Sequence, residues 1–128
     1  MSSKKIVNNF IVLLCIFCLG VPIVSASTCN ELRDTVKDAR NELLHAKSED
    51  GFARAKHYAR RAERSLDDAT RETLRCACDR AHREFRSAAS YAHRAKNAKE
   101  VQQFSIMINR SLREFDSANR ALRQCVRN

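Results

Sequence analysis

The segment Cys76-Ala77-Cys78 joins two stretches of the chain that are bounded by cysteines at equal spacing. The cysteines of these stretches are separated by 47, 2 and 47 residues: Cys29, Cys76, Cys78 and Cys125. Residues 29–76 and 78–125 can therefore be overlaid at an offset of 49 residues, which places ten identical residues opposite each other. The spacing and the overlay together predict an internal repeat.

The apolar residues of both stretches follow the spacing of packed helices. They recur at alternating intervals of three and four residues over 29–46 and 52–76, and the second stretch repeats both series over 78–95 and 101–125. This alternation is the heptad pattern of helices that lie side by side. The four cysteines all occupy positions of this pattern, so we expect four helices with a cysteine at one end of each.

Short breaks separate the two helices within each stretch. Ser48-Glu49-Asp50-Gly51 supplies capping oxygens and a glycine that tolerates unusual dihedral angles, and a weaker break is expected at Asn97-Ala98-Lys99. The helical spacing of the apolar residues predicts an all-α fold. Because short connections make neighbouring helices antiparallel, we expect this fold to consist of two tandem disulfide-stapled antiparallel helical hairpins.

The arrangement of the two hairpins depends on residues 76–78. A helix that ran straight through would place the two apolar stripes on nearly opposite faces, because two residues turn a helix by about 200°. That outcome is an elongated three-helix arrangement with one long central helix. If the chain breaks instead, with Asp79 as N-cap, the hairpins fold together as a four-helix bundle. We favour the bundle because it buries more of the large apolar side chains, which are Phe85, Phe104, Ile106, Met107, Ile108, Leu112 and Phe115.

The four cysteines of residues 27–128 predict disulfides, since an even number in a short exported chain is typical of them. Antiparallel helices bring the two ends of each stretch together, so we expect Cys29–Cys76 and Cys78–Cys125. The pairings Cys29–Cys78 with Cys76–Cys125, and Cys29–Cys125 with Cys76–Cys78, stay open. The alanine-rich stripes bury little area, whereas a disulfide that closes a loop of this length contributes about 2–4 kcal/mol.

Residues 1–26 have the features of a cleaved signal peptide. Lys4-Lys5 precedes an apolar run over residues 10–24, and cleavage is expected after Ala26. The run is shorter than the roughly 20 residues of a membrane-spanning helix. The sequence therefore predicts a secreted or periplasmic protein whose mature part, residues 27–128, is a single helical domain.

The chain is basic, with 24 Lys and Arg against 15 Asp and Glu and a net charge of +9. Residues 51–99 carry 13 basic and 6 acidic side chains. Arginine suits bidentate contact with carboxylate or phosphate, so this middle segment is a candidate anion-binding surface. Its candidate residues are Arg54, Lys56, Arg60, Arg61, Arg64, Arg71, Arg75, Arg80, Arg83 and Arg86.

The sequence does not indicate an enzyme, a cofactor or a metal site. Residues 27–128 contain no Gly-rich loop and no nucleophile elbow. The four histidines are not completed by further ligands into a tight cluster, and cysteines held in disulfides do not bind metal. These histidines are His45, His57, His82 and His93.

Two classes of function remain. Disulfide-stapled four-helix bundles occur among exported inhibitors, immunity proteins and chaperones, which is a likeness of architecture alone. We expect a non-enzymatic protein-binding module of the inhibitor, immunity or adaptor type, with a protein as its partner. The alternative is a binder of anionic lipid or glycan surfaces through the arginine-rich middle segment. Export argues against a genomic nucleic-acid partner, and no small-molecule substrate is expected.

Overall fold

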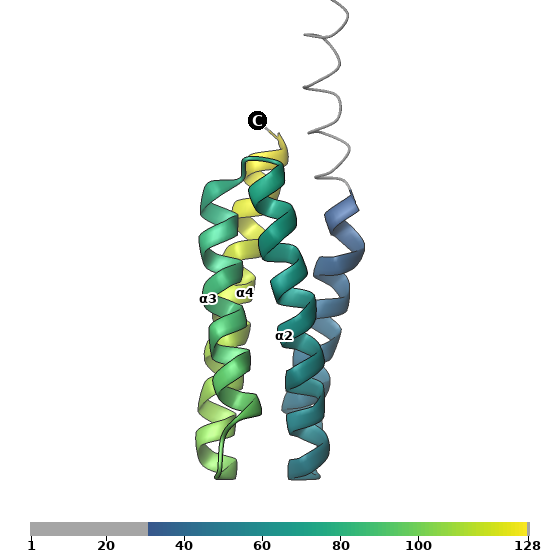
Figure 1. The fold of residues 1–128 in the computed structure, drawn as a ribbon, viewed down its shortest axis with the longest axis vertical. Coiled ribbons are helices and arrows are strands. Elements are labelled where there is room, and N and C mark those ends of the chain that lie inside the picture. The colour runs from purple at the N-terminus through teal and green to yellow at the C-terminus, as the bar shows by residue number, and fades with distance from the viewer. Residues whose placement is uncertain (1–30, 128) are drawn as a thin grey trace, which may run out of the picture.

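The computed structural model describes residues 31–127, which form four helices and contain no strand. The first helix covers residues 31–48, and it is followed by α2 (Phe52–Arg75), α3 (Asp79–Lys96) and α4 (Val101–Arg127). The helices lie side by side along the long axis of the molecule (Figure 1). The predicted all-α class and the four-helix bundle are confirmed, and the elongated three-helix alternative is wrong.

Each helix packs against the helices that adjoin it in the sequence. α3 contacts both α2 and α4 extensively, whereas α2 and α4 scarcely meet and are therefore diagonal neighbours. The first helix borders α2, where Arg61 Nη2 lies 3.1 Å from Glu42 Oε1. The connection between α2 and α3 lies at the same end of the bundle as the C-terminal end of α4 (Figure 1).

The core is built largely from alanine. Among the described residues, 14 of the 24 buried apolar side chains are alanine, so the helices approach closely but bury little area per residue. Larger side chains fill the second hairpin, where the rings of Phe85 and Phe115 meet edge to face with centres 5.9 Å apart. Two buried hydroxyls are satisfied by backbone carbonyls. Ser111 Oγ donates to Ala88 O across α3 and α4 at 2.8 Å, and Thr73 Oγ1 donates to Ala69 O at 2.8 Å.

Most of the large apolar residues expected in the core are there. Phe85, Phe104, Ile108 and Phe115 are buried, and Met107 and Leu112 are partly buried against them. The prediction for Ile106 is wrong, because its side chain is 45% exposed. Ile106 stands two residues from both Phe104 and Ile108, and a rotation of about 200° turns it to the opposite side of α4.

The chain breaks sharply at the joint between the hairpins. The amide of Cys78 donates to Thr73 O at 3.0 Å and the amide of Ala77 donates to Leu74 O at 3.2 Å, which is the Schellman pattern at a helix C-terminus. Ala77 has a φ of 57°, in the left-handed region that glycine usually occupies. Cys78 precedes α3 as its N-cap residue, and Asp79 is the first helical residue, so the prediction of Asp79 as N-cap is wrong.

The other two connections are short, as the sequence predicts. Gly51 is the N-cap residue of α2 with a φ of −80°, so the glycine does not use the unusual dihedral angles expected of it. Its amide donates instead to the side chain of Glu49, at 3.3 Å. The second break falls between Lys96 and Val101.

A disulfide joins Cys78 to Cys125, which ties the start of α3 to the last turns of α4 and is one of the two bridges that the sequence predicts. Cys76 is also disulfide-bonded. Its expected partner Cys29 lies outside the described residues, as does the predicted signal peptide, residues 1–26. Within residues 31–127, no helix is long and apolar enough to cross a membrane.

Replacement of Ala77 by glycine should stabilise the fold. A left-handed conformation costs an alanine roughly 1–2 kcal/mol, and part of this is offset by the greater freedom of glycine in the unfolded chain. We expect Ala77→Gly to raise the free energy of unfolding by about 0.5–1 kcal/mol in denaturant titrations. The matched control is Ala53→Gly at an exposed position in the first turn of α2, which should lower it by about 0.5 kcal/mol, less than glycine costs in a helix interior. Destabilisation by both variants would contradict the strain assigned to Ala77.

Removal of the Cys78–Cys125 bridge should weaken an alanine-rich core markedly. We expect Cys78→Ala/Cys125→Ala to lower the free energy of unfolding by about 2–4 kcal/mol, because the bridge closes a loop of 47 residues. Denaturant titration followed by circular dichroism measures the loss. A change below about 1 kcal/mol would show that the helix contacts suffice without the bridge.

Candidate binding face between the first helix and α4

The predicted anion-binding residues are distributed over α2 and α3. Three of them form ion pairs with nearby carboxylates: Arg61–Glu42, Arg71–Asp68 and Arg80–Glu84. Lys56 lies over the ring of Phe52, with Nζ 5.0 Å from the ring centre. Arg83 and Arg86 line a hollow on α3. The others are exposed on α2: Arg54, Arg60, Arg64 and Arg75.

A different set of cations surrounds a groove between the first helix and α4. This groove has a volume of about 440 Å³ and lies toward the end of the bundle that contains the joint. Five exposed cations line it: Arg33, Lys37, Arg40, Arg123 and Arg127. We call it the basic groove.

The cations of the basic groove are not neutralised by the described part of the protein. No carboxylate lines the groove among residues 31–127, and none of the five cations forms an ion pair there. Arg33, Lys37 and Arg40 follow one another at intervals of four and three residues, which places them on one side of the first helix. The groove therefore presents concentrated positive charge to solvent.

The floor of the basic groove is apolar. Val36, Phe115 and Leu122 form it and are at least 93% buried, whereas Val126 beside them is 51% exposed. The groove thus combines a charged rim with a single projecting apolar side chain.

A smaller apolar pocket of about 160 Å³ opens at the opposite end of the same two helices. Phe52, Val101, Phe104 and Ile108 form its apolar lining, and Lys47, Glu49 and Asp50 lie at its border. The rings of Phe52 and Phe104 meet edge to face with centres 5.8 Å apart. Val101 was expected on the buried stripe, but it is 64% exposed because it begins α4 at the end of the bundle.

The two hollows lie along the same side of the first helix. Arg40 lines the basic groove and Lys47 lines the apolar pocket, and Leu44 stands between them on the first helix. Leu44 is 43% exposed. We call the basic groove, Leu44 and the apolar pocket together the binding face. A protein segment that lay along it would meet cations at one end and apolar side chains at the other.

The four histidines make contacts within the bundle. His45 stacks on Tyr58 with ring centres 5.2 Å apart, and His57 meets the same tyrosine with ring centres 6.1 Å apart. His82 Nδ1 donates to Thr70 O at 2.7 Å and so ties α3 to α2. Among the described residues, no three His, Cys, Asp or Glu side chains are grouped as a metal ion requires.

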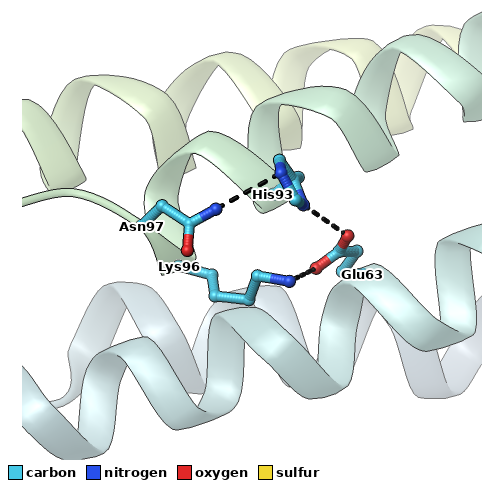
Figure 2. A network of polar contacts seen from close by, with 4 residues as sticks. All are labelled: Glu63, His93, Lys96 and Asn97. Atoms are coloured by element: carbon cyan, nitrogen blue, oxygen red, sulfur yellow. Dashed lines mark hydrogen bonds and ion pairs between the residues drawn. The ribbon is translucent and has the colours of Figure 1, made fainter.

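A polar network also ties α2 to α3 (Figure 2). The two carboxylate oxygens of Glu63 accept hydrogen bonds from His93 Nδ1 and from Lys96 Nζ, each at 2.8 Å. Asn97 Nδ2 lies 3.2 Å from His93 Nε2 and completes the group. Partial burial acts to raise the pKa of Glu63, but the hydrogen bonds and charges of Lys96 and His93 together outweigh it and lower this pKa.

Two other carboxyl groups of α2 have pKa values that are raised and not lowered. Burial, with the nearby charge of Glu63, raises the pKa of Asp67. Burial, with the charge of Asp68, also raises the pKa of Glu72, whose buried Oε2 has no hydrogen-bond partner. The charged form of Glu63 is therefore favoured by the fold, and the charged forms of Asp67 and Glu72 are disfavoured.

The chain matches no family model, and comparison with curated proteins and with solved structures finds no match.

Glu63→Gln should lower the free energy of unfolding at pH 7, whereas Glu72→Gln should not. The first variant removes a favourable charge and should lower the free energy of unfolding by about 1 kcal/mol. The second removes a partly buried charge with an unsatisfied oxygen, so it should leave stability unchanged or raise it. Denaturant titrations at a series of pH values measure both.

The two effects should fade at low pH. The folded-state pKa of Glu63 lies below its unfolded value, so its contribution is complete above the unfolded pKa of about 4.5 and is lost as the pH falls through the folded pKa. The penalty from Glu72 likewise disappears once that carboxyl is protonated. A Glu63→Gln difference that stayed constant down to pH 2 would rule out the charged network as its cause.

Proposed function

We propose that the protein is an exported, non-enzymatic protein-binding module of the inhibitor, immunity or adaptor type, whose binding face takes an acidic amphipathic helix of a partner protein. The observation that carries this proposal is the basic groove, where five cations without carboxylate partners in residues 31–127 flank an apolar floor. Charged side chains arranged in this way favour an occupant of opposite charge and speed its encounter.

The dimensions of the binding face suit a helix. From Arg33 to Lys47 the first helix advances by 14 residues, or about 21 Å. A partner helix of the same length has about four turns, enough to place acidic residues beside the groove and one apolar anchor in the distal pocket. Amphipathic helices bind other proteins through anchors spaced in this way.

The distribution of exposed apolar residues favours a protein over a small molecule. Five large apolar side chains are exposed among the described residues, and three of them lie on the binding face: Leu44, Val101 and Val126. They are spread along the face and are not enclosed in one cavity. A small ligand in the basic groove would leave Leu44 and Val101 uncovered, whereas a helix would cover all three.

The location of the protein is also part of the proposal. The predicted signal peptide supports export, and the Cys78–Cys125 disulfide is of the kind that persists in an oxidising compartment. The partner is then a secreted, periplasmic or surface protein.

Photocrosslinking in the native compartment tests the proposed partner. A photoreactive amino acid in place of Leu44 or Val126 should capture the same partner segment, and that segment should be an acidic amphipathic helix. The same amino acid in place of Arg64, which is exposed on α2, should not capture it. A non-acidic segment, or equal capture from position 64, would contradict the proposal.

Charge reversal in the groove tests the contact quantitatively. We expect Lys37→Glu/Arg123→Glu to weaken the purified complex at least tenfold, which is about 1.4 kcal/mol. The matched control, Arg60→Glu/Arg64→Glu on α2, changes the net charge equally and should weaken it less than threefold. Val126→Ser removes the projecting apolar contact, leaves the charge of the groove unchanged and should also weaken the complex. Equal losses in the two double variants would mean that net charge, and not the groove, governs binding.

A further inference from the structure

A second group of arginines lies on the outer side of α3, away from the first helix. The hollow there is lined by Arg83, Arg86, Ser87, Ser90, Tyr91 and Arg94. These residues span 11 positions of one helix, or about 17 Å. No carboxylate lines this hollow among the described residues. We call these six residues, with Arg110 of α4, the arginine patch.

Tyr91 holds two arginines of the patch in place. The guanidinium carbon of Arg94 lies 5.6 Å from the centre of the tyrosine ring, and that of Arg110 lies 6.0 Å from it. Cation–π contacts at these distances are favourable. They leave the N–H donors unused, because neither arginine forms an ion pair within residues 31–127. Side chains that are fixed before binding lose less entropy when a ligand arrives.

The chemistry of the patch suits sulfate or phosphate esters. A guanidinium donates two parallel hydrogen bonds to such oxygens, and the hydroxyls of Ser87 and Ser90 add donors between the arginines. Arg83 and Arg94 lie three turns apart along the helix. An extended chain that carries an anionic group at regular intervals would therefore contact several arginines at once.

We propose that the arginine patch binds a linear sulfated polysaccharide. Single-stranded nucleic acids bind proteins by stacking bases on aromatic faces, and both tyrosines already have ring contacts within the bundle. Arg94 and Arg110 lie over Tyr91, His45 stacks on Tyr58, and the sequence has no tryptophan. The Cys78–Cys125 disulfide suits the oxidising surroundings in which sulfated polysaccharides occur.

The patch and the binding face lie on different sides of the bundle. α3 packs between α2 and α4, so it is diagonal to the first helix. The two sites therefore do not overlap, and separate substitutions test the two proposals.

Calorimetric titration of the mature protein with a short heparin oligosaccharide, in 0.15 M NaCl, tests the patch. Arg86→Ser/Arg94→Ser should lower the affinity at least tenfold. The matched control Arg60→Ser/Arg64→Ser removes the same charge from α2 and should lower it less than threefold. All four side chains are exposed, and circular dichroism checks that the helices are retained. Equal losses in the two double variants would overturn the proposal.

Tyr91 is a positioning residue in this proposal, and two substitutions test that role. Tyr91→Phe keeps an aromatic face for Arg94 and Arg110, so the heparin affinity should stay within twofold. Tyr91→Leu removes the face and should lower the affinity about fivefold. Equal affinities in the phenylalanine and leucine variants would show that the ring does not hold the arginines.

Two further probes distinguish the ligand class. Hyaluronate carries carboxylates without sulfate and should bind at least tenfold more weakly than heparin of equal length. An oligothymidylate of equal charge should also bind at least tenfold more weakly. Equal binding of hyaluronate would refute the assignment to sulfate, and equal binding of oligothymidylate would assign the patch to nucleic acid instead of polysaccharide.

Discussion

The left-handed backbone of Ala77 is the constraint on which the rest of the structure depends. With a φ of 57° at this residue, α2 ends and the chain turns back within three residues. Without that turn, α2 would continue into α3 as one long helix, and the second hairpin would point away from the first. The turn brings α4 beside the first helix, and the binding face exists only because these two helices are neighbours.

The alanine-rich core explains why this turn is reinforced by cysteines. Small side chains let α2, α3 and α4 pack closely, but each contributes little buried area. Polar contacts therefore carry a larger share of the specificity between helices: Ser111 to Ala88, His82 to Thr70, and Glu63 to Lys96 and His93. The Cys78–Cys125 bridge fixes α3 and α4 next to the joint, and the Sγ atoms of Cys76 and Cys78 lie 3.9 Å apart. Cys76 and Cys78 therefore lie close together at the end of the bundle that contains the joint.

The sequence predicts the fold well because the fold follows from periodicity. Heptad spacing and the cysteine separation of 47 residues are regular signals, and they define four helices and the Cys78–Cys125 pair. Details that depend on local geometry are harder to predict from the sequence. Ile106 is expected in the core because its side chain is apolar, but its position on α4 turns it outward. Ala77 carries no sign of a left-handed conformation, since glycine is the usual residue at such a position.

The binding face was harder to predict because the net charge of a segment does not show how its charged residues are arranged around a helix. Residues 27–50 contain more acidic than basic side chains, so the first helix does not look like an anion-binding element. Packing separates these charges. Glu42 turns to Arg61 of α2, while Arg33, Lys37 and Arg40 share the side that borders α4. Spacing of cations by four and three residues was visible in the sequence, and it points to a charged stripe where the net charge does not.

The same reasoning applies to α4, which contributes to both proposed sites. Arg123 and Arg127 face the first helix, whereas Arg110 lies over Tyr91 of α3. A helix can serve two surfaces because residues that share one side recur every three to four positions, so its other sides are free for different contacts. In a bundle whose core is mostly alanine, the long arginine side chains make up much of the surface, and their grouping by helix side creates separate basic regions. The arrangement of arginine around each helix, more than its abundance, therefore determines what this scaffold can bind.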